Sequence, residues 1–280
     1  MKKNYLLVLL STVSFLITSL QSFSQFSSKR FFIRFADKNS SPYSVSSPSA
    51  YLSARAIQRR TNQGIGISIQ DLPVNPQYLD TLIAHGASLY NHSKWLNGVT
   101  ISVANQNVLD DILALPIVIS STHVKRPVQS RTNKFEMESV MLERANNPPY
   151  EVQSYSYGPS FNQIHLMNGE YLHNLGYHGE GVVIALLDAG FADVSSQYAF
   201  DSLRARGAIL GTWDFTNNES DVYTTNNDDN HGAAVLSCIA GNVPGTLVGT
   251  APMADFYLLR SEDAPVENII EEYDWASAAE

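Results

Sequence analysis

Two residues in the second half of the chain, Asp188 and His231, have side chains that can work together in acid–base chemistry. A carboxylate that accepts a hydrogen bond from an imidazole fixes the tautomer of the ring and stabilises the imidazolium that forms during proton transfer. A histidine held in this way can act as general base towards a hydroxyl nucleophile. Taken singly, an aspartate at a strand end usually caps a turn, and a histidine near a helix start usually lies in solvent. The pair therefore predicts chemistry only if the fold brings the two side chains together.

Both residues stand where regular elements are predicted to end or begin. Asp188 follows the apolar run 182–187, whose lack of alternation predicts a strand of a parallel sheet that is buried on both faces. His231 opens a run of small residues to Ala240, which predicts a helix that can approach a sheet closely. Strands that alternate with helices predict an α/β domain, in which chemistry collects at the carboxyl ends of the strands. Three further elements are predicted here: a helix over Gln163–Leu175, a strand over Ala254–Leu259 and a helix over Glu267–Ala279.

Residues 30–127 predict a separate small domain. Its helices have clear start signals, since Asn75 precedes Pro76 and Asn105 precedes an apolar helical pattern. The dipeptide Asn97-Gly98 predicts a tight hairpin, because both residue types tolerate positive φ. The predicted elements are a strand over Phe31–Ala36, a helix from Pro76 to Gly86, strands over Ala87–Ser93 and Val99–Val103, a helix from Asn105 to Leu115 and a strand over Ile117–Val124. With a basic helix over Ala50–Arg60 set aside as an insertion, this order predicts a small α+β, ferredoxin-like domain.

The N-terminus has the pattern of a signal peptide. Lys2 and Lys3 precede the apolar stretch 6–20, and Ser22 and Ser24 suit cleavage before Gln25. The stretch is shorter and more polar than the ~20 apolar residues that a membrane span needs. We therefore expect an exported protein.

Composition excludes several classes of protein. With 44% apolar and 16% charged residues, the 280-residue chain is an ordinary globular mixture and is not disordered as a whole. A net charge of -9 makes nucleic acid and anionic membrane surfaces poor partners. The single cysteine, Cys238, allows no intrachain disulfide and is expected to be a small buried residue.

Three blocks of the second half together resemble a known family. Residues 179–190, Gly-Glu-Gly-Val-Val-Ile-Ala-Leu-Leu-Asp-Ala-Gly, resemble the aspartate block of the subtilisin-like serine proteases. Residues 231–240, which begin His-Gly, resemble their histidine block, and residues 249–254, Gly-Thr-Ala-Pro-Met-Ala, resemble the Gly-x-Ala-Pro-x-Ala turn that follows it. The aspartate block precedes the histidine block, which agrees with the order Asp, His, Ser of that family's triad. The resemblance implies that Asp188 orients and stabilises His231, and that His231 deprotonates a catalytic serine.

The sequence departs from the family in three places. The histidine block usually reads His-Gly-Thr-His-Val but here reads His-Gly-Ala-Ala-Val, and Ala189 stands where Ser or Thr is usual. No Gly-Thr-Ser occurs between Gly241 and Glu280. We therefore expect the serine and the oxyanion-hole asparagine in a further part of a longer protein, and we expect this chain alone to be inactive.

The resemblance also implies a domain organisation and partners. We expect a signal peptide over 1–24, a propeptide-like domain over 30–127, a linker or processing region over 128–157 and the first part of a parallel-sheet, subtilisin-like α/β catalytic domain over 158–280. The propeptide would assist folding and block the active site, the substrate would be a protein or peptide, and the enzyme would be secreted. The family implies no cofactor beyond the calcium that some members bind, and the sequence assigns no ligands to calcium.

Parts of the sequence also fit three other functions. A dinucleotide-binding fold needs its glycines after the first strand, whereas Gly176, Gly179 and Gly181 precede it. A metal site could include Asp228, Asp229 and His231, but it would need further ligands. A non-catalytic secreted binding module on the same fold would lack the serine block, which a longer sequence would reveal.

Overall fold

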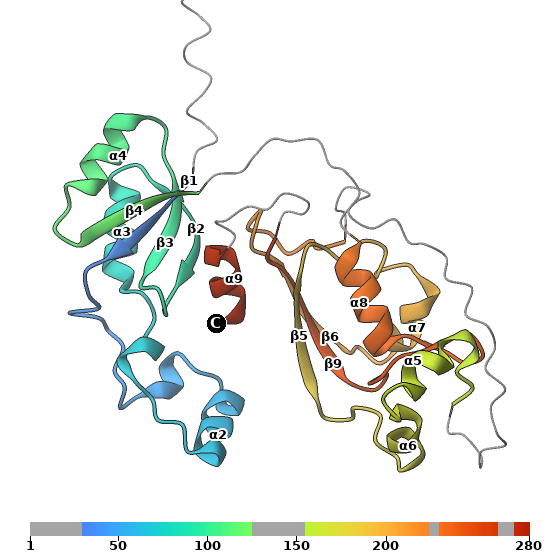
Figure 1. The fold of residues 1–280 in the computed structure, drawn as a ribbon. Helices are drawn as coiled ribbons and strands as arrows, with labels where there is room; N and C mark the ends of the chain where they lie inside the picture. The colour runs from blue at the N-terminus through green and yellow to red at the C-terminus, as the bar shows by residue number, and fades with distance from the viewer. Residues whose placement is uncertain (1–29, 125–154, 224–229, 263–271) are drawn as a thin grey trace, which may run out of the picture. The chain divides into compact units, whose positions relative to one another are not determined.

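The computed structural model describes residues 30–124, 155–223, 230–262 and 272–280 (Figure 1). The chain divides into two compact units, residues 1–125 together with Glu280, and residues 126–279. The predicted signal peptide, most of the predicted linker, Asp228, Asp229 and the first residues of the helix predicted from Glu267 lie outside the described residues. Among the helices of the described part, none is long and apolar enough to cross a membrane.

The first unit is built on a four-stranded antiparallel sheet with the strand order β2-β3-β1-β4. One core cluster joins α3 and α4 to the sheet through Leu82, Leu109, Ile112, Ile33 and Ile101, so both helices pack on one face. The elements in chain order are β1 (Arg30–Phe35), η1 (Pro48–Ala50), α2 (Ala54–Gln63), η2 (Ile69–Asp71), α3 (Pro76–Ala84), β2 (Ser88–Ser93), β3 (Gly98–Ser102), α4 (Gln106–Leu113) and β4 (Val118–Val124).

The helix starts of this unit follow their capping residues, as predicted. The Asn75 side-chain oxygen accepts a hydrogen bond from the Gln77 backbone amide at 3.0 Å, and Pro76 is the first helical residue of α3. The Asn105 side chain accepts from the Val108 amide at 3.1 Å at the start of α4. These bonds satisfy amides that the helix itself leaves without a partner.

The hairpin between β2 and β3 differs from the predicted tight turn. Ser93 pairs with Gly98, so a four-residue loop, residues 94–97, joins the strands. Asn97 has a φ of 50°, but Gly98 is already a strand residue. A Cβ at Gly98 would lie 2.4 Å from the Ile33 carbonyl oxygen and 2.5 Å from the Phe32 ring. The glycine is therefore required for close packing and not for turn geometry.

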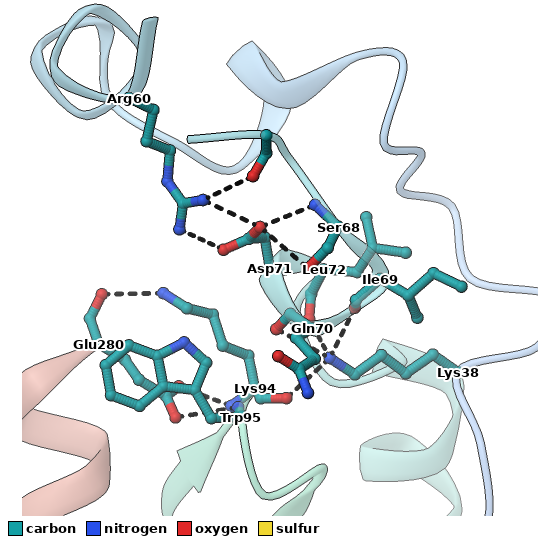
Figure 2. A network of polar contacts seen from close by, with 11 residues as sticks. Lys38, Arg60, Ser68, Ile69, Gln70, Asp71, Leu72, Lys94, Trp95 and Glu280 are labelled. Atoms are coloured by element: carbon teal, nitrogen blue, oxygen red, sulfur yellow. Dashed lines mark hydrogen bonds and ion pairs between the residues drawn. The ribbon is translucent and has the colours of Figure 1, made fainter. Parts of the chain in front are cut away.

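A polar network holds the segment between β1 and α3 (Figure 2). Helix α2 begins at Ala54, four residues later than predicted, because Ser53 caps it by accepting from the Ala56 amide at 3.1 Å. The Arg60 guanidinium pairs with the Asp71 carboxylate, which also accepts from the Ser68 amide at 2.9 Å. The Lys38 ammonium donates to the backbone carbonyl oxygens of Leu72 at 2.6 Å and Lys94 at 2.7 Å. Burial is the largest cause that lowers the pKa of Lys38.

The second unit contains a parallel three-stranded sheet with the order β5-β9-β6, which makes the protein a mixed helix-and-sheet chain with the predicted parallel pairing. Strand β6 was not predicted. Helices α7 and α8 pack on one side of this sheet (Figure 1). Leu203 of α7 and Leu236 of α8 share a core cluster with Phe256 and Leu258 of β9. The strands are β5 (Val183–Asp188), β6 (Ile209–Asp214), β7 (Asn242–Val243), β8 (Leu247–Val248) and β9 (Asp255–Arg260). The helices are η3 (Gly158–Ser160), α5 (Phe161–His165), α6 (Gly169–Asn174), η4 (Tyr198–Phe200), α7 (Asp201–Ala205), α8 (His231–Ala240) and α9 (Glu272–Ala279).

Two burial predictions for this unit are wrong. Strand β5 is not buried on both faces, because Ile184 and Leu186 pack against the core whereas Ala185 is exposed. Cys238 is also exposed. The buried residues of α8 are Gly232, Leu236 and Ala240, one turn apart, so Cys238 lies off the buried stripe of this helix.

The single helix predicted over Gln163–Leu175 is two short helices. Asn168 interrupts it with a φ of 54°, in the left-handed region that ends a helix. Gly176, with a φ of 87°, follows α6 in the stop position that was predicted.

Candidate active site

Charged residues end all three strands of the parallel sheet. Arg260 ends the central strand β9, and it pairs in register with Asp188 of β5 on one side and with Asp214 of β6 on the other. The carboxyl ends of parallel strands lie at one edge, which is where open α/β sheets bind ligands. The structure therefore places a row of two carboxylates and a guanidinium at this edge.

The structure brings the two predicted residues, Asp188 and His231, into direct contact. His231 Nδ1 lies 3.0 Å from each carboxylate oxygen of Asp188. An ionised carboxylate only accepts hydrogen bonds, so Nδ1–H is the donor and the neutral ring has its basic nitrogen at Nε2. The Asp188 side chain is 11% exposed and that of His231 is 47% exposed, so the pair stands with its aspartate inside and its imidazole at the surface.

Backbone amides hold both the side chain and the backbone carbonyl group of Asp188. The Ala189 amide donates to Asp188 Oδ1 at 2.7 Å, and the Ser261 amide donates to the Asp188 carbonyl oxygen at 3.1 Å. Ala189 itself is buried. The residues that directly follow β5 and β9 therefore fix the orientation of Asp188.

Gly232 allows α8 to begin beside Asp188. A Cβ at this position would lie 2.6 Å from the Gly190 carbonyl oxygen and 2.9 Å from Asp188 Cβ. No side chain larger than hydrogen fits there without movement of the backbone. The close approach puts His231, the first residue of the helix, within reach of the carboxylate.

A buried ion pair that the sequence did not predict lies at the same edge. Arg260 Nη1 donates to Asp214 Oδ2 at 2.8 Å and to Thr216 Oγ1 at 2.5 Å, and Arg260 Nε donates to the Ala189 carbonyl oxygen at 2.6 Å. The arginine and aspartate side chains are only 4% and 1% exposed. For Arg260, the signal that could have identified it is the charged residue directly after the apolar residues of β9, as Asp188 follows those of β5; no comparable run precedes Asp214.

Glu262 adds a further acidic group to the edge. It follows Ser261, whose amide is bonded to Asp188. Burial is the largest cause that raises the pKa of the Glu262 carboxyl. The negative charge of Asp188 raises this pKa further, and the charge of His231 opposes the rise.

The described residues include no group of three or more His, Cys, Asp or Glu side chains that could hold a metal ion. Two of the three residues considered for a metal site, Asp228 and Asp229, lie outside this part of the chain, while His231 contacts Asp188. The arrangement at the sheet edge can hold and move a proton on an imidazole.

Comparison with known proteins gives a family match for part of the chain. Residues 30–139 match the peptidase S8 propeptide domain of Bacteroidota. A dibasic-processing endoprotease of Schizosaccharomyces pombe is 33% identical over 115 residues, which are 40% of this chain and 15% of that protein. The chain thus spans about a seventh of the length of this curated relative. The solved structure of the MycP3 protease from the type VII (ESX-3) secretion system is 21% identical, covers 45% of this chain and 34% of its own, and superposes with a TM-score of 0.31.

Proposed function

We propose, from the premise that this chain carries a peptidase S8 propeptide domain, that it is the N-terminal part of a secreted subtilisin-type serine endopeptidase. The observation that carries the proposal is the contact of His231 Nδ1 with both Asp188 oxygens at 3.0 Å. The two residues are 43 positions apart, and they meet at the carboxyl edge of a parallel sheet. The match to a protease propeptide supplies independent support, since all but residues 126–139 of the matched range belong to the other unit of the chain.

In the proposed mechanism Asp188 and His231 are two members of an Asp-His-Ser triad. Asp188 holds the Nδ1–H tautomer, so His231 Nε2 accepts the proton of the serine hydroxyl as that oxygen attacks a peptide carbonyl. The imidazolium that results is stabilised by the Asp188 carboxylate, and it returns the proton to the leaving amine. In this proposal the nucleophile is the serine of a further part of the protease, and the proton transfers between serine, His231 and the leaving amine need no cofactor.

The first unit is proposed to be the intramolecular inhibitor and folding aid of the protease. Its element order, strand-helix-strand-strand-helix-strand once α2 is set aside, and its strand order β2-β3-β1-β4 support a ferredoxin-like propeptide. In this proposal residues 1–24 are a signal peptide, residues 128–157 contain the processing bond, and the mature enzyme begins its catalytic domain near residue 158.

The substrate is proposed only at the level of a protein or peptide. The fission-yeast relative is described as a dibasic-processing endoprotease, but the similarity covers 15% of that protein.

The proposal is tested by processing of the full-length protein. His231→Ala and Asp188→Asn should leave the propeptide attached and should abolish peptide hydrolysis, because loss of a triad member costs orders of magnitude in rate. The matched controls are His165→Ala and Glu170→Gln, which alter another histidine–carboxylate contact with nearly the same exposure, 43% and 13%. The controls should be processed normally. Normal processing of the His231→Ala protein would refute the protease assignment and would favour the binding module.

A further inference from the structure

We propose that Arg260 is a positioning residue for Asp188, and that it acts through the Ala189 peptide. This inference rests on the proposed function, since it concerns the aspartate of the proposed triad. It assigns a role to the buried guanidinium of Arg260, the residue that pairs in register with the proposed catalytic aspartate.

The geometry of Arg260 joins all three strand ends. Its Nη1 is bonded to Asp214 Oδ2 and Thr216 Oγ1, at 2.8 and 2.5 Å, at the end of β6. Its Nε is bonded to the Ala189 carbonyl oxygen at 2.6 Å, just beyond the end of β5. The planar guanidinium presents its donors in a rigid fork, so a group anchored by Asp214 holds Ala189 in a set position.

Ala189 transmits this position to the carboxylate. The carbonyl oxygen of Ala189 accepts from Arg260, while its amide donates to Asp188 Oδ1 at 2.7 Å. The same residue therefore touches the guanidinium with one end and the proposed catalytic carboxylate with the other. A shift of Ala189 moves the carboxylate relative to His231. Misplacement of a catalytic group by about 1 Å can cost roughly a hundredfold in rate.

Stability alone is a poor explanation for this arginine. A buried ion pair loses the hydration of both charges, and well-packed apolar residues are often at least as stabilising. What an apolar side chain would not supply is the hydrogen bond to the Ala189 carbonyl oxygen. The contact that distinguishes Arg260 is the one that reaches the Asp188 turn.

The test compares Arg260→Lys with two other variants. Lysine keeps the positive charge for Asp214 but lacks the fork that also reaches Ala189. Asp214→Asn breaks the ion pair but leaves the Nε bond to Ala189 available. Arg206→Lys is the matched control, because Arg206 also donates to backbone carbonyl oxygens, those of Pro252 at 3.1 Å and Ala254 at 3.0 Å, next to the opposite end of β9.

The first measurement needs no activity and uses the 280-residue chain. The proton on His231 Nδ1, hydrogen-bonded to a carboxylate, should give a low-field NMR signal that Asp188→Asn removes. Arg260→Lys should broaden or shift this signal, whereas Arg206→Lys should leave it unchanged. If Asp188→Asn removes the signal and Arg260→Lys does not affect it, the positioning role is overturned while the proposed function stands. If Asp188→Asn has no effect, the triad contact and the inference both fail.

The second measurement uses the full-length protease at a temperature where every variant is folded. A positioning role predicts that Arg260→Lys lowers kcat by about ten- to a hundredfold with little change in KM, and that Asp214→Asn lowers kcat less although it destabilises the fold more. The control Arg206→Lys should keep the parent kcat. A purely structural role predicts that kcat follows stability across the three variants, and that result would overturn the proposal.

Discussion

The buried pair of Asp214 and Arg260 makes a sharp prediction about stability, because an exposed pair of the same chemistry lies in the same unit. The Asp214 carboxylate accepts from the Thr216 amide at 2.7 Å and hydroxyl at 2.7 Å, from the Asn217 amide at 3.0 Å and side chain at 2.9 Å, and from Arg260 at 2.8 Å. Asp214→Asn keeps the size of the side chain but removes its charge, and it puts an amide donor where an acceptor is needed. The guanidinium, 4% exposed, then stays buried without the negative charge of Asp214.

The magnitude follows from burial. Removing one partner of a buried ion pair costs about 3–5 kcal/mol, because the remaining charge stays out of water. The comparator is Asp201→Asn, since Asp201 pairs with Arg204 three residues away on α7 and its side chain is 70% exposed. Exposed helical pairs contribute about 0.3–0.5 kcal/mol. The two charge-removing substitutions should therefore differ by about 3 kcal/mol or more.

The assay is urea unfolding followed by tryptophan fluorescence. In a Trp95→Phe background the two remaining tryptophans, Trp213 and Trp275, both lie in the second unit. With a urea dependence of about 2 kcal/mol/M, Asp214→Asn should lower the midpoint by about 1.5–2.5 M, and Asp201→Asn by less than about 0.3 M. If both variants had the same urea midpoint and the same urea dependence of the free energy of unfolding, the argument that Asp214 and Arg260 form a buried ion pair would be refuted.

Two further predictions concern the surroundings of the Asp188–His231 contact, and a third concerns the exposed contact of Glu180 with His178. Gly232→Ala should destabilise the unit by about 1–3 kcal/mol, because the new methyl group meets the Gly190 carbonyl oxygen and Asp188 Cβ. The same substitution should weaken the low-field NMR signal of His231. A higher urea midpoint, which helix propensity alone would give, would contradict this prediction. Glu262→Gln should raise stability at pH 7. A carboxyl whose pKa is raised in the folded state stabilises the fold at pH values below the pKa of an unfolded glutamate, and this contribution is lost as the pH rises through the raised pKa. The neutral glutamine has no such loss at pH 7. Thermal unfolding at pH 7 and pH 4 tests it, and the advantage over the parent protein should disappear at pH 4. Glu180→Gln should instead lower stability at pH 7, because hydrogen bonds to its own backbone amide and to His178 lower the pKa of Glu180. If both variants changed the unfolding temperature at pH 7 in the same direction, the argument would be contradicted.

Sequence patterns predicted the features that depend on neighbouring residues. The caps at Asn75 and Asn105 are formed within three residues, so local sequence is enough to locate them. The apolar runs that end at Asp188 and Arg260 predicted parallel strands, which the structure contains. The contact of Asp188 with His231 was implied by the family resemblance, and the predicted strand end and helix start were consistent with it.

Apart from the Asp188–His231 contact, the features that depend on packing between distant elements were missed. Strand β6 has an irregular register between Ile209 and Gly211 and only short apolar content, so no periodic pattern marks it. Without β6 the partner of Arg260 could not be identified. The same limit explains the wrong burial of Cys238, since the buried stripe of α8 depends on which face meets the sheet.

Contact between a histidine and a carboxylate is not by itself the mark of an active site in this unit. His165 Nδ1 lies 2.5 Å from Glu170, and His178 Nδ1 lies 3.0 Å from Glu180. Those partners are five and two residues apart, so local chain geometry brings them together whatever the rest of the fold does. Asp188 and His231 meet only if a strand end and a helix start are packed against each other across 43 residues. Substitutions that disturb this packing without touching either side chain, such as Gly232→Ala, should therefore break this contact and leave the two local ones intact.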